Sequence, residues 1–326
     1  MAIVLTGKTG LIGSQLFAGL SRHTEIIAPT HDAFDITNKQ EVNALISAHA
    51  PRVIIHAAAF TDNDTAEEER GDKKGRCWQV NVDGTKNIVD AAKKVGAYVI
   101  YISTGSVFAG DDTHQGPFKE EDPTSPQSSL SWYAWTKAVA ETLVTNGAII
   151  RLSHPVSKDN QTKHFDYIHT ILGLYDKGKL YPLFTDQIFP ITYLPDLAAA
   201  IINIITSLSS AHEFTVHPSA LRHSSYTSGL QILRSDGARN CAPYREVYHV
   251  VSVDGVSPFE LARYAISKAK GVKDPKLPKT TFDAFVKHVS LPKRYAKYCA
   301  IDGSESRKKL GLSDRSWRKI VDCLFP

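Results

Sequence analysis

Tyr133 and Lys137 are the residues of this chain whose types and spacing best suit acid–base chemistry. Four residues make about one helical turn, so both side chains project from one helix face. An ammonium beside a phenol favours the phenolate, so the spacing predicts that Lys137 lowers the pKa of Tyr133 towards the working range of a proton-transfer catalyst. In a chain with 13 tyrosines the spacing means little alone, and its value depends on the elements placed around it.

A glycine-rich turn at residues 7–13 (GKTGLIG) lies between a short apolar strand and an amphipathic helix. Gly7 permits a tight turn, Gly10 lets the backbone approach a pyrophosphate, and Gly13 lets the helix pack closely on the sheet. The helix N-terminus offers backbone N–H groups and a positive dipole end to phosphates. The turn therefore predicts a dinucleotide site.

The end of the second predicted strand bears on the choice of dinucleotide. An acid there takes the ribose hydroxyls of NAD, whereas a cationic group tolerates a 2′-phosphate. His31 fits the second role, Asp32 beside it argues for the first, and an exposed loop histidine is an equally good interpretation. The sequence thus favours NADPH over NADH only slightly.

The first half of the chain alternates strands and helices. Short, nearly continuous apolar runs predict five strands, at residues 3–5, 25–28, 52–56, 98–102 and 148–152. Helices are predicted between them, including residues 79–95 and 133–145, and Thr37 with Gln40 predicts a capping box. This pattern is typical of an α/β, doubly wound parallel Rossmann sheet covered on both faces.

After residue 153 this rhythm ends. We expect residues 1–153, joined by roughly 190–208 and by 246–252, to form the dinucleotide-binding domain. Residues 154–189 and 209–326 are then a smaller, interleaved C-terminal substrate lobe. Residues 209–245 form an unusually long polar insertion, which is interpreted either as a substrate lid or subunit arm, or as a surface insertion.

Composition narrows the class of protein. The 326 residues are 42% hydrophobic and 22% charged with a net charge of +4, which indicates a soluble globular protein and gives no reason to expect nucleic acid as a partner. The longest apolar stretch is too short for a membrane span, which needs about 20 residues. Four widely spaced cysteines predict reduced thiols, a cytoplasmic location and no metal site.

Ordered motifs run through nearly the whole chain. They are residues 7–13; Asp35-Ile36-Thr37; residues 56–61; residues 81–85; Ile102-Ser103-Thr104 with Val107-Phe108; Gly116-Pro117-Phe118 with Glu121-Asp122-Pro123; Tyr133 with Lys137; Asp186-Gln187 with Pro190; Asp196-Leu197-Ala198; and Leu310-Gly311-Leu312 with Trp317-Arg318. Together they resemble the extended short-chain dehydrogenase/reductases, and more closely the dTDP-4-dehydrorhamnose reductase branch.

The resemblance implies a catalytic set of Thr104, Tyr133 and Lys137, with Asn81 in support. Thr104 would hydrogen-bond a substrate carbonyl, Tyr133 would protonate its oxygen, and Lys137 would hold the nicotinamide ribose. The backbone around Asn81 would hold a water that links Lys137 to solvent; the alternative interpretation is a helix residue that caps a local carbonyl.

The resemblance also implies the ligands. The cofactor is NADPH or NADH, and the residues implied in binding it are Gly7, Gly10, Leu11, Ile12, Gly13, His31, Asp35, Ile36, Ala57, Ala58, Ala59, Thr61, Ser103, Tyr133 and Lys137. The substrate implied is a nucleotide-linked 4-keto-6-deoxysugar, which the protein would reduce in deoxysugar or surface polysaccharide biosynthesis, and a homodimer is compatible with the sequence. The alternatives are an epimerase or dehydratase with bound NAD, and a non-catalytic, cofactor-binding regulatory subunit.

Departures from the family pattern cluster around the expected sugar pocket. The usual Ser-Thr-Asp-Tyr run is Ser103-Thr104-Gly105-Ser106 here, so an acid and a phenol are replaced. Ala134 stands where a glycine usually follows the tyrosine, and Ser131 stands where an asparagine precedes it. These changes leave the redox residues in place and concern the identity of the sugar.

Overall fold

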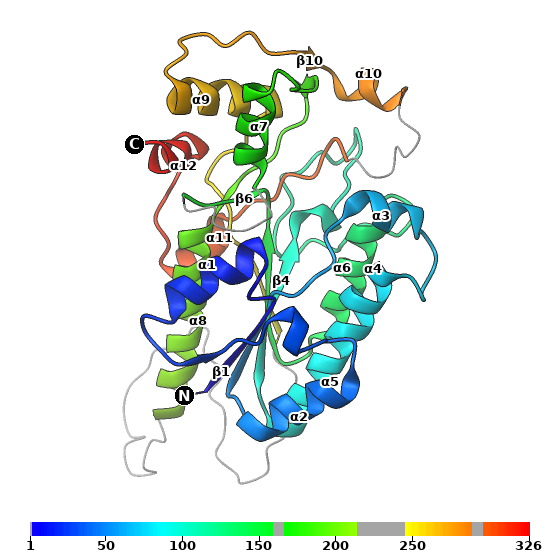
Figure 1. Cartoon of the computed structure of the whole chain (residues 1–326), viewed down its shortest axis with the longest axis vertical. Helices are drawn as coiled ribbons and strands as arrows, with labels where there is room; N and C mark the ends of the chain where they lie inside the picture. The colour runs from blue at the N-terminus through cyan, green and yellow to red at the C-terminus, as the bar shows by residue number, and fades with distance from the viewer. Residues whose placement is uncertain (1, 159–165, 214–244, 289–295) are drawn as a thin grey trace, which may run out of the picture.

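The computed structural model describes residues 2–158, 166–213, 245–288 and 296–326. Its centre is a six-stranded, wholly parallel sheet in the order β2-β1-β3-β4-β5-β9 (Figure 1). The strands are β1 (Ile3–Thr6), β2 (Ile26–Ile27), β3 (Val53–His56), β4 (Tyr98–Thr104), β5 (Gly147–Leu152) and β9 (Arg245–His249). Their apolar side chains are almost all buried, as expected for parallel strands covered on both faces. The predicted doubly wound sheet is confirmed.

The strand order places a topological switch point at β1. From β1 the chain moves to β2 on one side, and then to β3, β4 and β5 on the other. Open α/β sheets bind ligands in the crevice beyond the carboxyl ends of the strands at such a point. Here that edge carries the glycine-rich turn after Thr6 and the loop after His56, which are partners in the β1–β3 register.

Two helical layers cover the sheet. Helices α1 (Leu11–Leu20) and α8 (Leu194–Glu213) pack on one face, where Leu16, Leu197 and Ile201 join a core with β1, β4 and β5. Helices α2 (Lys39–His49), α5 (Thr85–Val95) and α6 (Trp132–Leu143) cover the other face (Figure 1). Helix α6 carries Tyr133 and Lys137, so this second layer fixes the position of the predicted catalytic pair.

A second hydrophobic core lies beyond the carboxyl edge of the sheet. It joins α7 (Tyr167–Asp176), α9 (Pro258–Lys270) and α12 (Trp317–Leu324) with strand β7 (Leu183–Phe184), which pairs with β10 (Lys279–Thr280). In Figure 1 these elements form the upper lobe. Helix α11 (Ser304–Leu310), which lies between β10 and α12 in the chain, packs through Leu310 against the sheet core instead. The lobe is therefore built from separate segments that return to the sheet between them.

The remaining elements are short and lie mostly at the carboxyl edge. They are η1 (His31–Ala33), α3 (Asn63–Glu68), α4 (Arg76–Trp78), the π-helix η2 (Gln79–Gly84), η3 (Gly105–Val107), β6 (Pro155–Val156), β8 (Thr192–Tyr193) and α10 (Phe282–Val286). The helix predicted over residues 79–95 thus begins as a π-helix and continues as α5. π-Helical turns inside helices are frequently found at functional sites.

The predicted capping box at Thr37 and Gln40 is wrong. Asn38 is the N-cap of α2, and its side chain accepts hydrogen bonds from the backbone of Gln40 and Glu41. The Thr37 hydroxyl instead donates to the Asp35 carboxylate at 2.8 Å. The Glu41 carboxylate completes the cap by accepting from the Asp35 backbone N–H at 2.9 Å.

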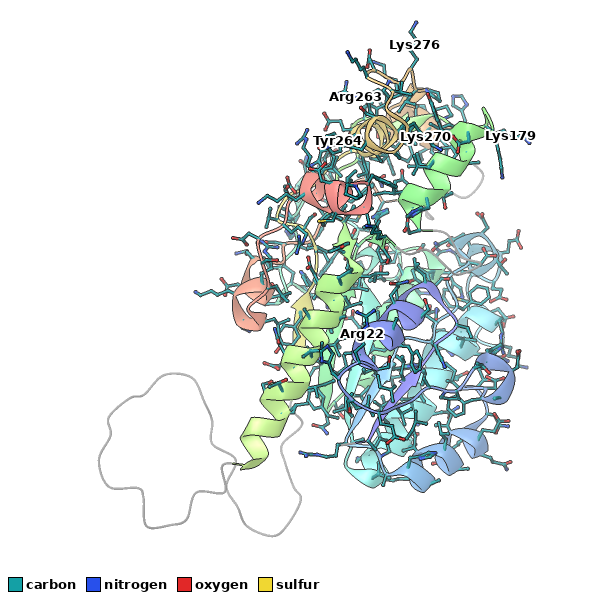
Figure 2. The ribbon with its side chains drawn as sticks, turned by 60° about the vertical axis from the view of Figure 1, so that its left-hand side comes forward. Arg22, Lys179, Arg263, Tyr264, Lys270 and Lys276 are labelled. Carbon is teal, nitrogen blue, oxygen red and sulfur yellow. The ribbon has the colours of Figure 1, made fainter. Side chains whose placement is uncertain are left out.

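Two further expectations can be placed on the structure. Of the insertion at 209–245, residues 209–213 end α8 and Arg245 starts β9, while the rest lies outside the described residues. Arg263, Lys270 and Lys276 project from the upper lobe in Figure 2. Lys270 pairs there with Asp176 at 2.7 Å, as on an ordinary solvated surface. No helix in the described ranges is long and apolar enough to cross a bilayer.

Candidate active site

The glycine-rich turn has the geometry that its sequence predicts. Gly7 has φ +77°, and a Cβ there would lie 2.6 Å from the backbone nitrogen of Ala58. A Cβ on Gly13 would lie 2.0 Å from the carbonyl oxygen of Gly7, so α1 packs directly on the turn. A Cβ on Gly10 would meet only that same oxygen, at 3.4 Å. Gly7 and Gly13 are thus required by the protein's own packing, whereas Gly10 is not.

The start of α1 suits a phosphate group. Gly10 is the N-cap residue and supplies no side-chain cap, and the first turn holds no acidic side chain. The backbone N–H groups of Leu11 and Ile12 belong to this first turn, where the helix dipole favours an anion. The residues present therefore fit a dinucleotide pyrophosphate.

A buried polar chain supports the turn and the neighbouring loop. The Thr6 hydroxyl contacts His56 Nδ1 at 2.7 Å, and His56 Nε2 contacts the Thr85 hydroxyl at 3.0 Å. Thr85 in turn donates to the backbone carbonyl of Asn81 at 2.7 Å. Burial, together with the charge of Lys137, lowers the pKa of His56 to about 3, so its imidazole stays neutral.

Asn81 ties the loop after β3 to the catalytic helix. Its side-chain oxygen accepts from the Phe60 backbone N–H at 2.8 Å, and its amide donates to the Phe60 carbonyl at 3.1 Å and to the Thr136 hydroxyl at 3.0 Å. The Asn81 carbonyl accepts from Thr85. Asn81 therefore holds the segment that contains Ala57, Ala58, Ala59 and Thr61 against α6, and its role as a water ligand stays a prediction.

Tyr133 and Thr104 come together at the carboxyl end of β4. Tyr133 lies in the first turn of α6, which Ser131 caps by accepting from the Ala134 N–H at 3.2 Å. Burial and the neighbouring Cys77 raise the pKa of Tyr133 to about 12, and hydrogen bonding to Thr104 opposes this rise only partly. The tyrosine is therefore protonated at neutral pH.

The prediction that Lys137 lowers the pKa of Tyr133 is wrong in this structure. The Lys137 Nζ donates to the Ile102 carbonyl at 2.8 Å and lies 4.1 Å above the Tyr101 ring. Burial lowers the pKa of Lys137 to about 7, although Glu141 acts to raise it. A lysine that is itself half-deprotonated near neutral pH cannot hold the phenol as a phenolate there.

The residues predicted at the adenosine end lie after β2. His31 is exposed in η1, directly after the N-cap residue Thr30. The Asp35 carboxylate accepts from the Thr37 backbone and hydroxyl; burial alone would raise its pKa, but these hydrogen bonds outweigh that effect and lower it. Ile36 lies beside this turn, and its side chain contacts the position that a Cβ on Gly84 would occupy.

Gly105 and Ser106, which depart from the family pattern, and Trp132 beside the catalytic tyrosine have structural roles. Gly105 faces Ile301, whose Cδ1 would lie 3.2 Å from a Cβ on the glycine. The Ser106 N–H donates to the Thr104 hydroxyl at 3.1 Å, so Thr104 is the N-cap of the short helix η3 that contains Ser106. Trp132 is buried and stacks on Trp78 with ring centroids 5.7 Å apart, so it belongs to the core.

Ser103 was predicted to contact the cofactor, but its hydroxyl is already engaged. It donates to the Glu141 carboxylate at 2.6 Å, and both side chains are buried. The predicted contact of Ser103 with the cofactor stays a prediction. Glu141 was not predicted as a site residue, although its spacing of four residues from Lys137 places both on one face of α6.

A second residue missed by the sequence analysis is His154, two positions beyond β5. Its φ is +42°, a strained conformation for a residue other than glycine, and such strain is concentrated at functional edges. Its ring stacks on Phe189 at a centroid distance of 3.6 Å, and Nδ1 contacts the Ser153 hydroxyl at 3.0 Å. Burial lowers the pKa of His154 to about 4, so the imidazole is neutral.

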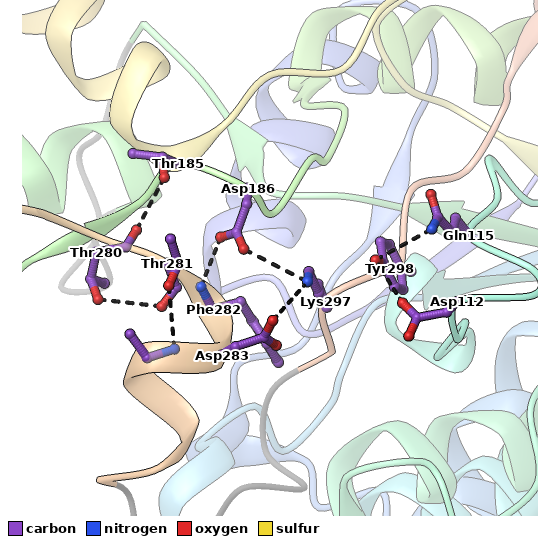
Figure 3. Close-up of polar contacts among 11 residues, drawn as sticks. Asp112, Gln115, Thr185, Asp186, Thr280, Thr281, Phe282, Asp283, Lys297 and Tyr298 are labelled. Carbon is purple, nitrogen blue, oxygen red and sulfur yellow. Dashed lines mark hydrogen bonds and ion pairs between the residues drawn. The ribbon is translucent and has the colours of Figure 1, made fainter.

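The segment 296–303 fastens the upper lobe to the sheet domain (Figure 3). Lys297 pairs with Asp186 at 3.7 Å and with Asp283 at 3.2 Å, both in the lobe. The Tyr298 hydroxyl donates to Asp112 at 3.0 Å, in the loop after β4. Gln187, which belongs to the predicted Asp186-Gln187 motif, donates to the Ala296 carbonyl at 2.6 Å. The motif thus anchors this segment.

Two cavities are found away from the predicted site. One of about 360 Å³ lies between α9 and α12, lined by Arg263, Tyr264 and Trp317 among others, on the lobe shown in Figure 2. The other, of about 280 Å³, borders Glu141 and Arg151. Neither is lined by Tyr133 or Thr104. Within the described ranges, no cluster of three or more His, Cys, Asp or Glu side chains is placed to hold a metal ion.

A parallel sheet with a glycine-rich turn at its switch point, and a Thr/Tyr/Lys group at the end of β4, defines an extended short-chain dehydrogenase/reductase. Residues 1–240 match the family model described as RmlD substrate binding domain, and the chain belongs to this family.

Comparison with individual proteins supports the same family. The chain is 31% identical to dTDP-4-dehydrorhamnose reductase of Aggregatibacter actinomycetemcomitans over 208 residues, which are 62% of this chain and 66% of that protein, just under two thirds of its length. It is 30% identical to the Sinorhizobium fredii protein of the same name, over 65% of this chain and 68% of that one. A crystal structure of dTDP-4-dehydrorhamnose reductase from Bacillus anthracis in complex with NADP superimposes with a TM-score of 0.76 at 25% identity, covering 99% and 98% of the two chains.

Proposed function

We propose that this protein is an NADPH-dependent reductase of a nucleotide-linked 4-keto-6-deoxysugar, of the dTDP-4-dehydrorhamnose reductase type. The observation that carries the proposal is the placement of a protonated Tyr133 beside Thr104 at the carboxyl end of β4. The names of the relatives and the NADP in the Bacillus anthracis structure support the same reaction.

The residues divide the chemistry between them. Bound NADPH would supply the hydride. Thr104 would hydrogen-bond the substrate carbonyl oxygen, and Tyr133 would deliver a proton to that oxygen as negative charge develops on it. The Lys137 ammonium would hold the nicotinamide ribose and compensate the charge left on the phenol.

The remaining residues would bind the cofactor. Gly7, Gly10 and Gly13, with the first turn of α1, would hold the pyrophosphate. His31 would meet the 2′-phosphate of NADPH from η1, whereas Asp35 is already engaged by Thr37. We further propose a cytoplasmic location, with which the free thiols of Cys77, Cys299 and Cys323 agree, and a homodimer as the assembly to test by sedimentation.

The proposal is tested by incubating the protein with NADPH and a panel of dTDP-, UDP- and GDP-linked 4-keto-6-deoxysugars. Net oxidation of NADPH with at least one of them is expected. Tyr133→Phe should lower kcat by about 10²–10⁴-fold while NADPH still binds, because it removes only the proton donor. Tyr264→Phe is the matched control, since its hydroxyl bonds to Asp322 in the upper lobe and its loss should leave kcat unchanged.

The same assay separates the alternatives. Turnover of the sugar without net change in cofactor would indicate an epimerase or dehydratase that returns the hydride. Binding of NADPH with no turnover of any sugar, or unchanged turnover in Tyr133→Phe, would refute the proposed reductase.

A further inference from the structure

A row of buried polar side chains crosses the sheet beneath the catalytic helix. Ser103 on β4, Arg151 on β5 and His249 on β9 are direct neighbours in the strand register. All three are buried, with exposed fractions of 4%, 2% and 0%. In a parallel sheet whose strands are mostly apolar, polar residues in the same register position on three adjacent strands are unusual.

Glu141 of α6 is hydrogen-bonded to two members of this row. One carboxylate oxygen accepts from the Ser103 hydroxyl at 2.6 Å and from Arg151 Nε at 3.0 Å, and the other accepts from Arg151 Nη2 at 2.8 Å. The exposed fractions of the two charged side chains are 1% and 2%. A bidentate pair with a third hydrogen bond satisfies the buried carboxylate, but such pairs are weak evidence for stability alone. Its location suggests another use.

The row continues into the C-terminal segment. Arg151 Nη1 contacts His249 Nε2 at 3.3 Å, and His249 Nδ1 contacts the Asp302 carbonyl at 2.8 Å. The backbone N–H of His249 donates to the Ser306 hydroxyl at 2.7 Å, and that hydroxyl donates to the Glu120 carboxylate. The chain of contacts thus runs from α6 across three strands to α11. These contacts fix the position of α6 relative to the sheet.

Three successive residues at the end of β4 are each hydrogen-bonded to a side chain of α6. Tyr133 hydrogen-bonds Thr104, Lys137 donates to the Ile102 carbonyl, and Glu141 accepts from Ser103. Tyr133, Lys137 and Glu141 are spaced by four residues, so they lie on one face of the helix. Any slide or rotation of α6 relative to β4 would break these attachments together. Glu141 is the only one of the three that is itself clamped by an ion pair among the described contacts.

We propose that Glu141, clamped by Arg151 and Ser103, is a positioning residue that holds Tyr133 and Lys137 against the strand end that bears Thr104. This inference rests on the proposed reductase function of that site. The same placement has an electrostatic consequence. The Glu141 carboxylate raises the pKa of the buried Lys137 above the value that burial alone would give, so the lysine stays cationic up to a higher pH.

Two variants separate the charge of Glu141 from its hydrogen bond. Glu141→Gln removes the carboxylate charge and keeps a side chain of similar shape. We expect the pKa of Lys137 to fall by about one unit in this variant. Ser103→Ala removes one hydrogen bond and leaves the charge, so we expect kcat to fall several-fold with no shift of the pH profile. In both variants KM for NADPH should change little, because both side chains are buried and hydrogen-bonded to each other.

The titration of Lys137 is measured directly, by NMR of protein with labelled lysine Nζ and Cε atoms, in which Lys137→Met identifies the signal. This readout needs no substrate. The pH dependence of kcat with a 4-keto sugar is the second readout. Asp196→Asn is the matched control: Asp196 lies on α8, away from α6, and losing its ion pair with Arg315 should move neither readout.

Either of two results would overturn the inference. One is a Lys137 pKa in Glu141→Gln that equals the wild-type value, and the other is a kcat in Ser103→Ala that equals the wild-type kcat. Where Glu141→Gln alone fails to fold because Arg151 is left unpaired, the double variant Glu141→Gln/Arg151→Gln, which buries no net charge at the pair, gives the same titration test. If the wild type reduces no keto sugar, the proposed function fails, and the Lys137 titration still decides the inference.

Discussion

Adding a single methyl group to Gly10 or to Gly13 should separate the packing of the dinucleotide turn from its ligand chemistry. In Gly13→Ala the new Cβ would lie 2.0 Å from the Gly7 carbonyl oxygen and 2.6 Å from the Gly7 carbonyl carbon. Van der Waals contacts lie at about 3.5 Å, so α1 must move away from the turn by about 1 Å or more. Such overpacking costs about 1–3 kcal/mol of unfolding free energy, which lowers Tm by several degrees.

Gly10→Ala should behave differently. Its Cβ would meet only the Gly7 oxygen, at the ordinary distance of 3.4 Å, so the fold should tolerate it with little change in Tm. The added carbon lies where the pyrophosphate must approach the backbone, and we expect NADPH affinity to fall by about tenfold or more, which corresponds to about 1.4 kcal/mol.

Thermal unfolding and fluorescence titration of NADPH measure the two effects on the same samples. Gly173→Ala in α7 is the matched control, because nothing lies within 4 Å of its Cβ position. Replacing glycine in a helix should raise stability by about 0.5–1 kcal/mol without changing NADPH affinity. Wild-type NADPH affinity in Gly10→Ala, or wild-type stability in Gly13→Ala, would refute the assignment of this turn.

Three further predictions address the catalytic group and the choice of cofactor. Thr104→Val should lower kcat by about 10²–10³-fold while Thr104→Ser retains most activity, because only the hydroxyl binds the carbonyl; equal rates for the two variants would argue against that role. With a Lys137 pKa of about 7, kcat should decline as pH rises above about 7, and Lys137→Arg, whose guanidinium stays charged, should move or abolish this decline in a pH–rate profile. His31→Asp should raise the ratio of kcat/KM for NADH to that for NADPH, since an acid at this position repels a 2′-phosphate. An unchanged ratio would show that other residues determine the choice between the two cofactors.

The pH dependence of stability follows from the same lysine. Because its folded pKa is lowered from 10.5 to about 7, the unfolded state binds more protons between these values. The contribution of Lys137 to unfolding free energy therefore rises with pH across that window and is least favourable below about pH 7. Lys137→Met should flatten this part of the stability curve in chemical denaturation at a series of pH values.

Most of the sheet could be predicted from the sequence because its signals are local. Each strand is a short apolar run, and Gly7 and Gly13 occupy positions that no other residue could fill at a tight βα turn. The N-cap of α2 was assigned wrongly because Thr37 and Asn38 are both capping residues. The choice between them depends on Asp35, which engages the Thr37 hydroxyl.

The contacts that tune the site could not be predicted because they are not local. Ser103, Arg151 and His249 become neighbours only through the register of three strands. The Tyr298–Asp112 contact joins residues 186 positions apart, and the burial of Gly105 against Ile301 depends on the same returning segment. A spacing such as Tyr-x-x-x-Lys shows which residues share a helix face, but it does not show how deeply that face is buried.

The depth of burial changes what the tyrosine–lysine pair can do. A phenol with its pKa raised to about 12 is a poor base at neutral pH, but it is fully protonated and can serve as a proton donor. A proton donor is what carbonyl reduction requires, whereas the reverse oxidation needs a base to take the alcohol proton. The Lys137 ammonium can then stabilise the phenolate only after the proton has left, when the negative charge first appears. The burial that refutes a resting phenolate thus favours the reductive direction over an epimerase cycle, in which the same residue must act as base and acid in turn.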